Sequence, residues 1–506
     1  MTLYECIVKL NYKMNTNIFF RAFAYRHLRR LPFCSTFRGT IWKESAEAAE
    51  KAFVRRVFFC GIPVLTLRKL ENVTSVEIGS VPVLSIVNQE SKICGYIGVC
   101  EIFKVRYKGN IPIDYPSPSF IPVERSTKKL FFDIGVLHKK SGQYGIARTA
   151  YELLKALRNN MPEGYEVCPV YARSDCAGYF YANRYMNVHF ENSGVPDIDF
   201  PISISSGDIF LNVVTDSAGQ ELQKEALHTM RRLGVRIFFL FYDLIPLSHP
   251  QFVGPQFSAE FDRWIHLISE FDGIIADSAS AAEDYRRWRE ENWHGTEPFS
   301  IQWFHLGANF KKNSHPAALP VEAVSVLSAM KARPSLVEVS TVEPRKGHKQ
   351  SLAAFEQLWA KGMEVNFVIV GNKGWMMDDF YRKVEHHPEL GKKLFWLQGI
   401  SDDYLNAVYD AAAGVLMPSQ TEGFGLAVIE GAYHGKPLIL RDIPVFREIA
   451  GSHATYFNGL DPASLADCIE SWLNDLKKGS VISSSGIRPL TWDESAKMLL
   501  SRLPLQ

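Results

Sequence analysis

The sequence predicts an α/β protein with parallel sheets, and two observations carry that prediction. From residue 130 onward, short apolar runs alternate with amphipathic helical stretches, which is the pattern of repeated strand–helix units. A second series of the same kind begins near residue 334. A chain of 506 residues has room for both series as separate domains. We therefore expect two Rossmann-like domains that face a central cleft, with ligand at the carboxyl ends of the strands.

The first series contains four expected strands and one clear amphipathic helix. The strands are 130–134, 209–213, 237–242 and 273–275, and the helix is 145–157. The second series reads in the same way, with strands at 336–340, 366–370, 395–398, 414–417 and 437–440 and a helix at 350–361. We place the domain boundaries at 126–315 and 316–490, followed by a last helix at 491–506.

Residues 1–125 form a different, β-rich extension. Residues 1–43 carry eight Lys and Arg against one acid, and the segment 18–30 mixes basic and aromatic residues. That segment is either an amphipathic helix on an anionic membrane face or a solvated arm. Two β-like segments, 61–67 and 79–86, echo each other, and 94–107 suggests a further strand pair before a proline-rich linker at 111–122.

Bulk composition excludes several classes of protein. The net charge of +1 gives no bias toward nucleic acid. No apolar run reaches the roughly 18–20 residues that span a bilayer. The eight cysteines are scattered without a C-x-x-C pair, so we expect reduced thiols in a cytoplasmic protein and no zinc site.

Two loops of the second series carry the strongest chemical signals. Glu422 and Glu430 lie eight positions apart, and a Gly-Phe-Gly turn between them opens a helix. A helix N-terminus with glycines suits a phosphate-bearing ligand, because free N–H groups and the helix dipole point at it. Arg345 and Lys346 precede another helix, where their charges are unfavourable for the dipole but suited to a diphosphate. Taken by itself, each of the two loops also fits the start of an ordinary helix.

Together, the segments 342–348, 395–405 and 422–447 resemble the nucleotide-sugar half of retaining glycosyltransferases of family 4, which have the GT-B fold. Glu422 and Glu430 match the E-x7-E motif of that family. The sequences Glu-Pro-Arg-Lys-Gly at 343–347 and Arg-Asp-Ile-Pro-Val-Phe-Arg-Glu at 441–448 are most similar to bacterial surface-polysaccharide mannosyltransferases. The resemblance covers about residues 130–504, and it implies that the last helix, at 491–506, returns to the first of the two domains.

The resemblance implies roles for individual residues on the donor side. Glu422 would hold the hydroxyls of the donor sugar, Glu430 the ribose, and Lys346 with Arg345 the diphosphate as it leaves. The rest of the donor site would comprise Gly423, Phe424, Gly425, Leu426, Gly371, Gln398, Gly399 and Ile400. No metal and no other cofactor is expected.

On the acceptor side, the resemblance implies a glycine-rich loop that faces the diphosphate and the acceptor, with Gly142, Gly145 and Arg148. Asp243 keeps its place beside the sugar, but Tyr242 stands where many members carry a histidine. Either Tyr242 takes over the sugar contact or the sugar is oriented differently.

The expected activity is retaining transfer of a hexose, mannose from GDP-mannose, during synthesis of a surface polysaccharide such as lipopolysaccharide. The acceptor would be a glycan or a polyprenyl-diphosphate-linked glycan, used in the cytoplasm with peripheral contact to the inner face of the plasma membrane. Two alternatives stay open: a non-catalytic GT-B partner subunit, and a sugar-nucleotide epimerase or phosphorylase.

Overall fold

The computed structural model describes residues 53–59, 62–70, 73–78, 81–87, 125–135, 137, 145–173, 177–190, 193–213, 220–308 and 319–505. The chain divides into two compact units. The first draws on Met1–His138, Cys168–Ile209 and Gly219–Arg236, and the second on Lys139–Val167, Phe210–Ala218 and Ile237–Gln506.

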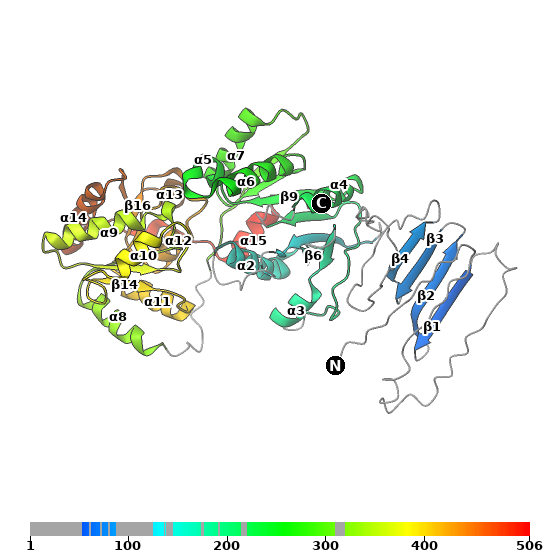
Figure 1. The fold of residues 1–506 in the computed structure, drawn as a ribbon, viewed down its shortest axis with the longest axis horizontal. Coiled ribbons are helices and arrows are strands. Elements are labelled where there is room, and N and C mark those ends of the chain that lie inside the picture. The colour runs from blue at the N-terminus through cyan, green and yellow to red at the C-terminus, as the bar shows by residue number, and fades with distance from the viewer. Residues whose placement is uncertain are drawn as a thin grey trace, which may run out of the picture. The chain divides into compact units, whose positions relative to one another are not determined.

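The N-terminal part of the first unit contains a four-stranded antiparallel sheet, drawn in blue in Figure 1. Its strands follow chain order: β1 (Phe53–Phe59), β2 (Ile62–Leu70), β3 (Val73–Ile78) and β4 (Val81–Val87). The two echoing segments of the sequence thus correspond to β2 and β4, which confirms a β-rich extension. The segments 18–30, 94–107 and 111–122 lie outside the described residues.

The first unit also contains strands of the α/β series. Neighbouring strands β5 (Lys128–Asp133), β6 (Tyr165–Ala172) and β7 (Tyr179–Tyr181) lie in that order, and β6 and β7 are antiparallel. Helices α3 (Asn183–His189) and α4 (Gln220–Arg232) belong to the same unit.

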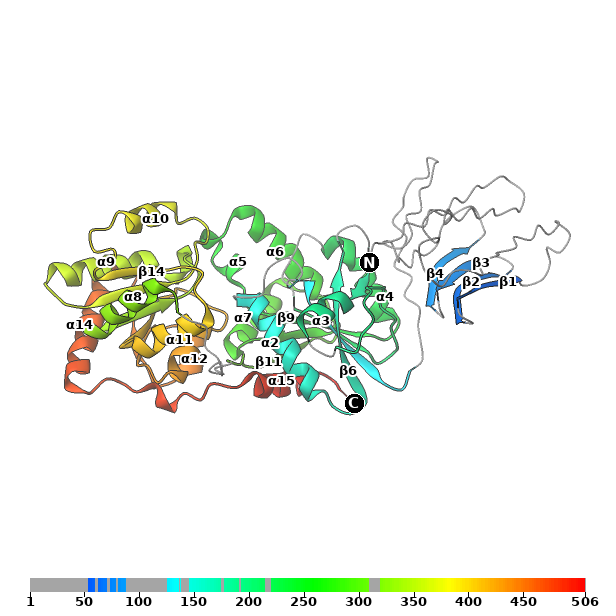
Figure 2. The same ribbon diagram turned by 90° about the horizontal axis from the view of Figure 1, so that it is seen from below.

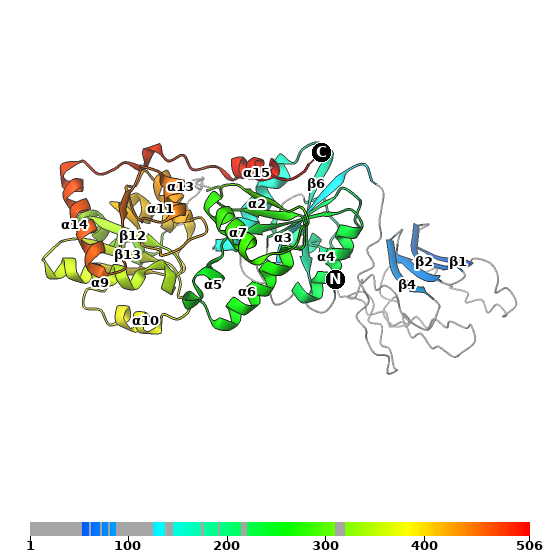
Figure 3. The ribbon, with the colours of Figure 1, turned by 90° about the horizontal axis from the view of Figure 1, so that it is seen from above.

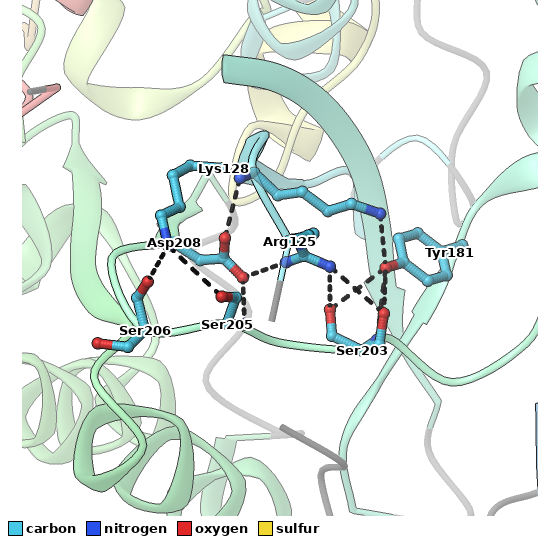
Figure 4. Close-up of polar contacts among 8 residues, drawn as sticks. Arg125, Lys128, Tyr181, Ser203, Ser205, Ser206 and Asp208 are labelled. Carbon is cyan, nitrogen blue, oxygen red and sulfur yellow. Dashed lines mark hydrogen bonds and ion pairs between the residues drawn. The ribbon is translucent and has the colours of Figure 1, made fainter. Parts of the chain in front are cut away.

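A buried carboxylate fixes the start of β5, as Figure 4 shows. Asp208 is fully buried, and its oxygens accept hydrogen bonds from the backbone N–H of Lys129 at 2.9 Å and of Ser205 at 2.6 Å. Arg125 forms an ion pair with the same carboxylate and donates to the carbonyl of Ser203 at 3.1 Å. A buried charge is costly unless it is paired, so the start of β5 is held where Arg125 and the backbone N–H of Lys129 can contact Asp208.

The second unit begins its α/β series with α2 (Gly145–Asn160) and continues with β8 (Ile209–Asn212), β9 (Arg236–Phe241), β10 (Gly273–Ala276) and β11 (Ser300–Trp303). These four strands neighbour one another in chain order, and the β9/β10 and β10/β11 pairs are parallel. Helices α5 (Ile245–Ser248) and α6 (Pro255–Ile268) lie between β9 and β10, and α7 (Ala279–Asn292) lies between β10 and β11. The last helix, α15 (Trp492–Leu500), packs against α2, as Figure 3 shows.

The second sheet of this unit is parallel throughout, with strand order β14-β13-β12-β15-β16-β17. The strands are β12 (Ser335–Val339), β13 (Asn366–Val370), β14 (Leu394–Leu397), β15 (Gly414–Met417), β16 (Leu438–Arg441) and β17 (Thr455–Phe457). The order reverses between β12 and β15. A ligand of such a sheet binds outside the carboxyl ends of the strands at that reversal.

Helices cover both faces of this second sheet because alternate side chains of each strand are apolar and point to opposite sides. Leu336 packs with α9 (His348–Ala360), α10 (Asp378–Glu385) and α14 (Pro462–Lys478). Its neighbour Val337 packs with α8 (Val321–Ala332), α11 (Asp402–Ala411), α12 (Leu426–Tyr433) and α13 (Pro444–Ala450). Helices α9 and α14 lie side by side in Figure 2.

The architecture confirms the predicted α/β class with parallel sheets. The strands expected at 366–370 and 414–417 coincide with β13 and β15, and the other expected strands of both series shift by a residue or two. None of the helices in the described ranges combines the length and apolar character needed to cross a bilayer.

Candidate functional site

The two loops with the strongest sequence signals meet at the point where the strand order reverses. The short 3-10 turn η4 (Pro344–Lys346) follows β12, and the loop that carries Glu422 follows β15. Gln420 donates its backbone N–H to the carbonyl of Arg345 at 2.8 Å, which ties the loops together. Two separate chain segments therefore build one site at the carboxyl ends of adjacent strands.

Glu422 is held by both cations of η4. Its Oε2 accepts a hydrogen bond from Nη1 of Arg345 at 2.8 Å, and its Oε1 lies 2.5 Å from Nζ of Lys346. Arg345 also pairs through Nε with Glu343 at 2.7 Å. The side chain of Glu422 is 6% exposed, so these contacts form in a poorly hydrated setting. The structure thus places both cations directly on Glu422.

Burial and charge act in opposite directions on this cluster. Burial would raise the pKa of Glu422, but the charges of Lys346 and Arg345 and their hydrogen bonds lower it to about 2. Burial, together with the charge of Arg345, lowers the pKa of Lys346. Burial opposes the charge on Arg345, yet Glu422 and Glu343 raise its pKa. Glu422 is therefore an anion, and Arg345 stays a cation beside it.

Two glycines let backbone segments approach closely at the site. A Cβ atom on Gly423 would lie 2.2 Å from the carbonyl oxygen of Tyr242. A Cβ atom on Gly371, which follows β13, would lie 1.8 Å from the carbonyl oxygen of Ser340. Both distances are below any real Cβ contact, so a larger residue would displace these loops.

Asp243 and Tyr242 come from the end of β9 and lie beside the Glu422 loop. Burial raises the pKa of Asp243, while the charge of Arg345 lowers it. The hydroxyl of Tyr242 donates to the carbonyl of Val213 at 3.3 Å, and burial with the charge of Asp277 raises its pKa well above the usual range. Asp243 is therefore close enough for the charge of Arg345 to change its pKa, whereas the hydroxyl of Tyr242 is hydrogen-bonded to the backbone of its own sheet.

Two further contacts join the segment around α7 to the second sheet. Ser278 caps α7 and donates its hydroxyl to the carbonyl of Gly423 at 2.7 Å. Glu448 accepts hydrogen bonds from the backbone N–H groups of Ala279 and Ser280, each at 2.8 Å, and from Nε2 of His305 at 2.7 Å. A carboxylate at a helix N-terminus is electrostatically favourable. The Ser278 bond thus ties the N-terminus of α7 to the Gly423 loop, and the Glu448 bonds tie it to α13.

Glu430 occupies a separate buried position in α12, which begins at Leu426 immediately after the Gly-Phe-Gly turn. Its Oε2 accepts a hydrogen bond from the hydroxyl of Tyr409 at 2.8 Å, and its Oε1 lies 3.4 Å from Nη1 of Arg148. Arg148, expected on the acceptor side, thus contacts the carboxylate expected to bind ribose.

The remaining predicted residues fall into three groups. The loop after β14, with Gln398, Gly399 and Ile400, contacts the loop after β13, because Gly399 donates its N–H to Oδ1 of Asn372 at 2.9 Å. Phe424 is buried, and Gly425 adopts a φ of 97° directly before α12. On the acceptor side, Gly145 begins α2, whereas Gly142 lies outside the described residues. Within the described ranges, no group of three or more His, Cys, Asp or Glu side chains could hold a metal ion.

Sequence reasoning missed several residues of the site: Asp277, Ser278, Glu343, Tyr409 and Glu448. Asp277 and Ser278 follow the short apolar strand β10, and their position at its carboxyl end was a usable signal. Tyr409 lies on the apolar face of α11 with Leu405 and Val408, so its sequence pattern is that of a core residue.

The chain is similar to known glycosyltransferases. Residues 326–487 match the family model described as "Glycosyl transferases group 1". The chain is 40% identical over 388 residues to the serotype-specific mannosyltransferase WbdA of Escherichia coli, a match that covers 76% of this chain and 46% of WbdA. The chain therefore spans about half the length of the curated relatives it matches first.

Two solved structures show the same fold at low sequence identity. One is Anabaena Alr3699/HepE in complex with UDP and glucose, with a TM-score of 0.50 and 14% identity over 74% of this chain and 100% of that chain. The other is sucrose-phosphate synthase from Thermosynechococcus elongatus, with a TM-score of 0.51 and 17% identity over 74% of this chain and 98% of that chain. The chain therefore carries a glycosyltransferase group 1 domain on a GT-B fold and resembles bacterial surface-polysaccharide mannosyltransferases, as its motifs predict.

Proposed function

We propose that the protein is a retaining glycosyltransferase that moves mannose from GDP-mannose to a glycan or polyprenyl-diphosphate-linked acceptor in O-antigen-type polysaccharide synthesis. The observation that carries the proposal is Glu422 held between Arg345 and Lys346 at the reversal of the strand order. The name of the similar protein WbdA supports mannose as the transferred sugar. We place the reaction in the cytoplasm, with peripheral contact to the inner face of the plasma membrane where a lipid-linked acceptor requires it.

In this proposal the ion pairs of Glu422 with Arg345 and Lys346 break when the donor binds. The diphosphate then binds Arg345 and Lys346, and Glu422 binds the hydroxyls of the sugar. As the bond between the anomeric carbon and the phosphate oxygen breaks, the two cations stabilise the negative charge that develops on the diphosphate. A preorganised pair of cations supplies this stabilisation without a metal.

The acceptor hydroxyl then attacks the anomeric carbon from the face that the diphosphate leaves, and its proton passes to the departing phosphate oxygen. Asp243 lies beside the cations and orients the reacting groups. Tyr242 acts through its position, because its hydroxyl donates to Val213 and its carbonyl touches the Gly423 loop. Retention follows from attack on the same face.

A panel of GDP-, UDP- and ADP-sugars tests the donor. A ligand at 100 times its dissociation constant adds about 2.7 kcal/mol of stability, which a thermal shift detects. We expect the largest shift with GDP-mannose, and we expect NMR of the transfer product to show the anomeric configuration of the donor. An inverted product would overturn retention, and the absence of any shift would overturn the nucleotide-sugar site.

The second candidate is a non-catalytic partner subunit. It is favoured by one observation, namely that the Tyr242 hydroxyl is engaged with the backbone of its own sheet where many family members carry a histidine. The same panel separates the two candidates, because a partner subunit would bind a nucleotide sugar without transferring the sugar. Release of free epimer, or dependence on inorganic phosphate, would instead reveal an epimerase or phosphorylase.

A further inference from the structure

Glu430 is held by two side chains that come from different helices. The hydroxyl of Tyr409, on α11, donates to its Oε2 at 2.8 Å, and Nη1 of Arg148, on α2, lies 3.4 Å from its Oε1. The side chain of Glu430 is 11% exposed and that of Arg148 is 20% exposed. Each oxygen of one buried carboxylate therefore has its own partner.

Tyr409 itself has little freedom to move. The residue is 1% exposed, and its ring stacks on His434 with a centroid distance of 5.0 Å and an interplanar angle of 18°. His434 is fixed in turn, because its Nδ1 lies 2.8 Å from Oδ1 of Asp410 and its Nε2 lies 3.3 Å from Oδ1 of Asn406. The direction of the Tyr409 hydroxyl is thus set by packing rather than by Glu430 alone.

We propose that Tyr409 is a positioning residue for recognition of the donor's ribose, which it achieves by fixing the carboxylate of Glu430, while Arg148 supplies the counter-charge. The proposal rests on the proposed function and on the role that the family resemblance implies for Glu430, which is to bind the ribose diol. An ionised carboxylate offers about four lone-pair sites on its two oxygens. Tyr409 and Arg148 take one site on each oxygen, so one site on each oxygen is left for the two ribose hydroxyls.

The charge of Glu430 matters for the same reason. Burial raises the pKa of Glu430, whereas Arg148 and the hydrogen bond from Tyr409 lower it. Asp402 raises it and His434 lowers it to a smaller extent. If Glu430 were protonated, one oxygen would become a donor and an acceptor site for the diol would be lost. Removing Arg148 raises this pKa further, so donor binding should fail at a higher pH than in the wild type.

The first experiment compares Tyr409→Phe with the wild type on the nucleotide sugar that gives the largest thermal shift and on its 2′,3′-dideoxyribose analogue. We expect the KM for the normal donor to rise about tenfold while kcat stays within about twofold, because an interaction equal in the ground and transition states affects KM alone. The dideoxy analogue should lose much of its disadvantage in the variant. Tyr404→Phe, on the same helix, is the matched control and should behave as the wild type.

Several outcomes are decisive. An unchanged KM together with an unchanged preference for the diol over the dideoxy analogue would overturn the positioning role of Tyr409. If the wild-type protein binds no nucleotide sugar at all, the proposed function fails instead, and the two failures are therefore distinguishable.

A second variant covers the case in which Tyr409→Phe does not fold. Arg148→Met acts on the same carboxylate from α2. The pH dependence of donor binding is measured between about pH 5 and 8, the range in which buried carboxylates titrate. We expect the acidic limb of donor binding to move to higher pH. An acidic limb at the wild-type position would contradict the proposal.

Discussion

Replacing Glu422 with Gln removes the anion on which two buried cations depend, and should lower the stability of the free protein. Each tenfold change in proton affinity corresponds to about 1.4 kcal/mol. The pKa of Glu422 falls from 4.5 to about 2, even though burial alone would raise it. This net shift corresponds to about 3 kcal/mol of stability that the ionised Glu422 adds to the folded state at pH 7. Because the folded pKa is depressed, this contribution is present above pH 4.5 and is lost as the pH falls toward 2.

The assay is urea unfolding at pH 7 without nucleotide, followed by the fluorescence of the ten tryptophans. Glu422→Gln should lower the free energy of unfolding by about 3 kcal/mol. The matched control is Glu470→Gln, which breaks an exposed pair whose Oε2 lies 2.6 Å from Nζ of Lys361, and it should change stability by less than about 0.5 kcal/mol. If Glu422→Gln unfolds at the same urea concentration as the wild type, or at a higher one, the ion pairs of Glu422 do not stabilise the folded protein.

Two further predictions concern residues outside the ion pairs of Glu422. Gly423→Ala would bring a Cβ atom to 2.2 Å from the carbonyl oxygen of Tyr242 and should displace the loop that carries Glu422. We expect the rate of sugar transfer to fall at least about tenfold while the circular dichroism spectrum stays unchanged. Full activity would show that the loop does not need this close approach. Burial raises the pKa of Glu338 from 4.5 to about 8, so the stability of the wild type should fall as the pH rises from 4.5 to about 8. In urea unfolding, Glu338→Gln should therefore become progressively more stable than the wild type between pH 5 and about 8. A constant difference in stability across that range would contradict a buried, neutral carboxyl group at Glu338.

The sequence predicted the frame of the site because its signals are local. The apolar strands at 366–370 and 414–417 are bounded by glycine and polar residues, and α12 begins where the Gly-Phe-Gly turn ends. Arg345, Lys346 and Glu422 were recognised because each stands just before a helix, where a phosphate-bearing ligand can bind, and because Glu422 matches the E-x7-E motif. Their roles in binding and catalysis remain predictions.

The sequence could not predict which cation meets which carboxylate. Arg345 and Lys346 both pair with Glu422, and Arg148 reaches Glu430, which lies 282 positions away in the chain. Tyr409 was invisible for a different reason, since a tyrosine on an apolar helix face has the pattern of a core residue whatever its hydroxyl contacts. Pairings of this kind depend on tertiary packing and not on local spacing.

The contribution of Lys346 to binding of the diphosphate can be measured directly. Calorimetric titration would compare GDP with GMP, which lacks the second phosphate, on the wild type and on Lys346→Met. We predict that the wild type prefers GDP by at least about tenfold, and that the variant loses most of that preference while still binding GMP. Equal preference in the wild type and the variant would contradict the assignment of this site to a nucleotide sugar.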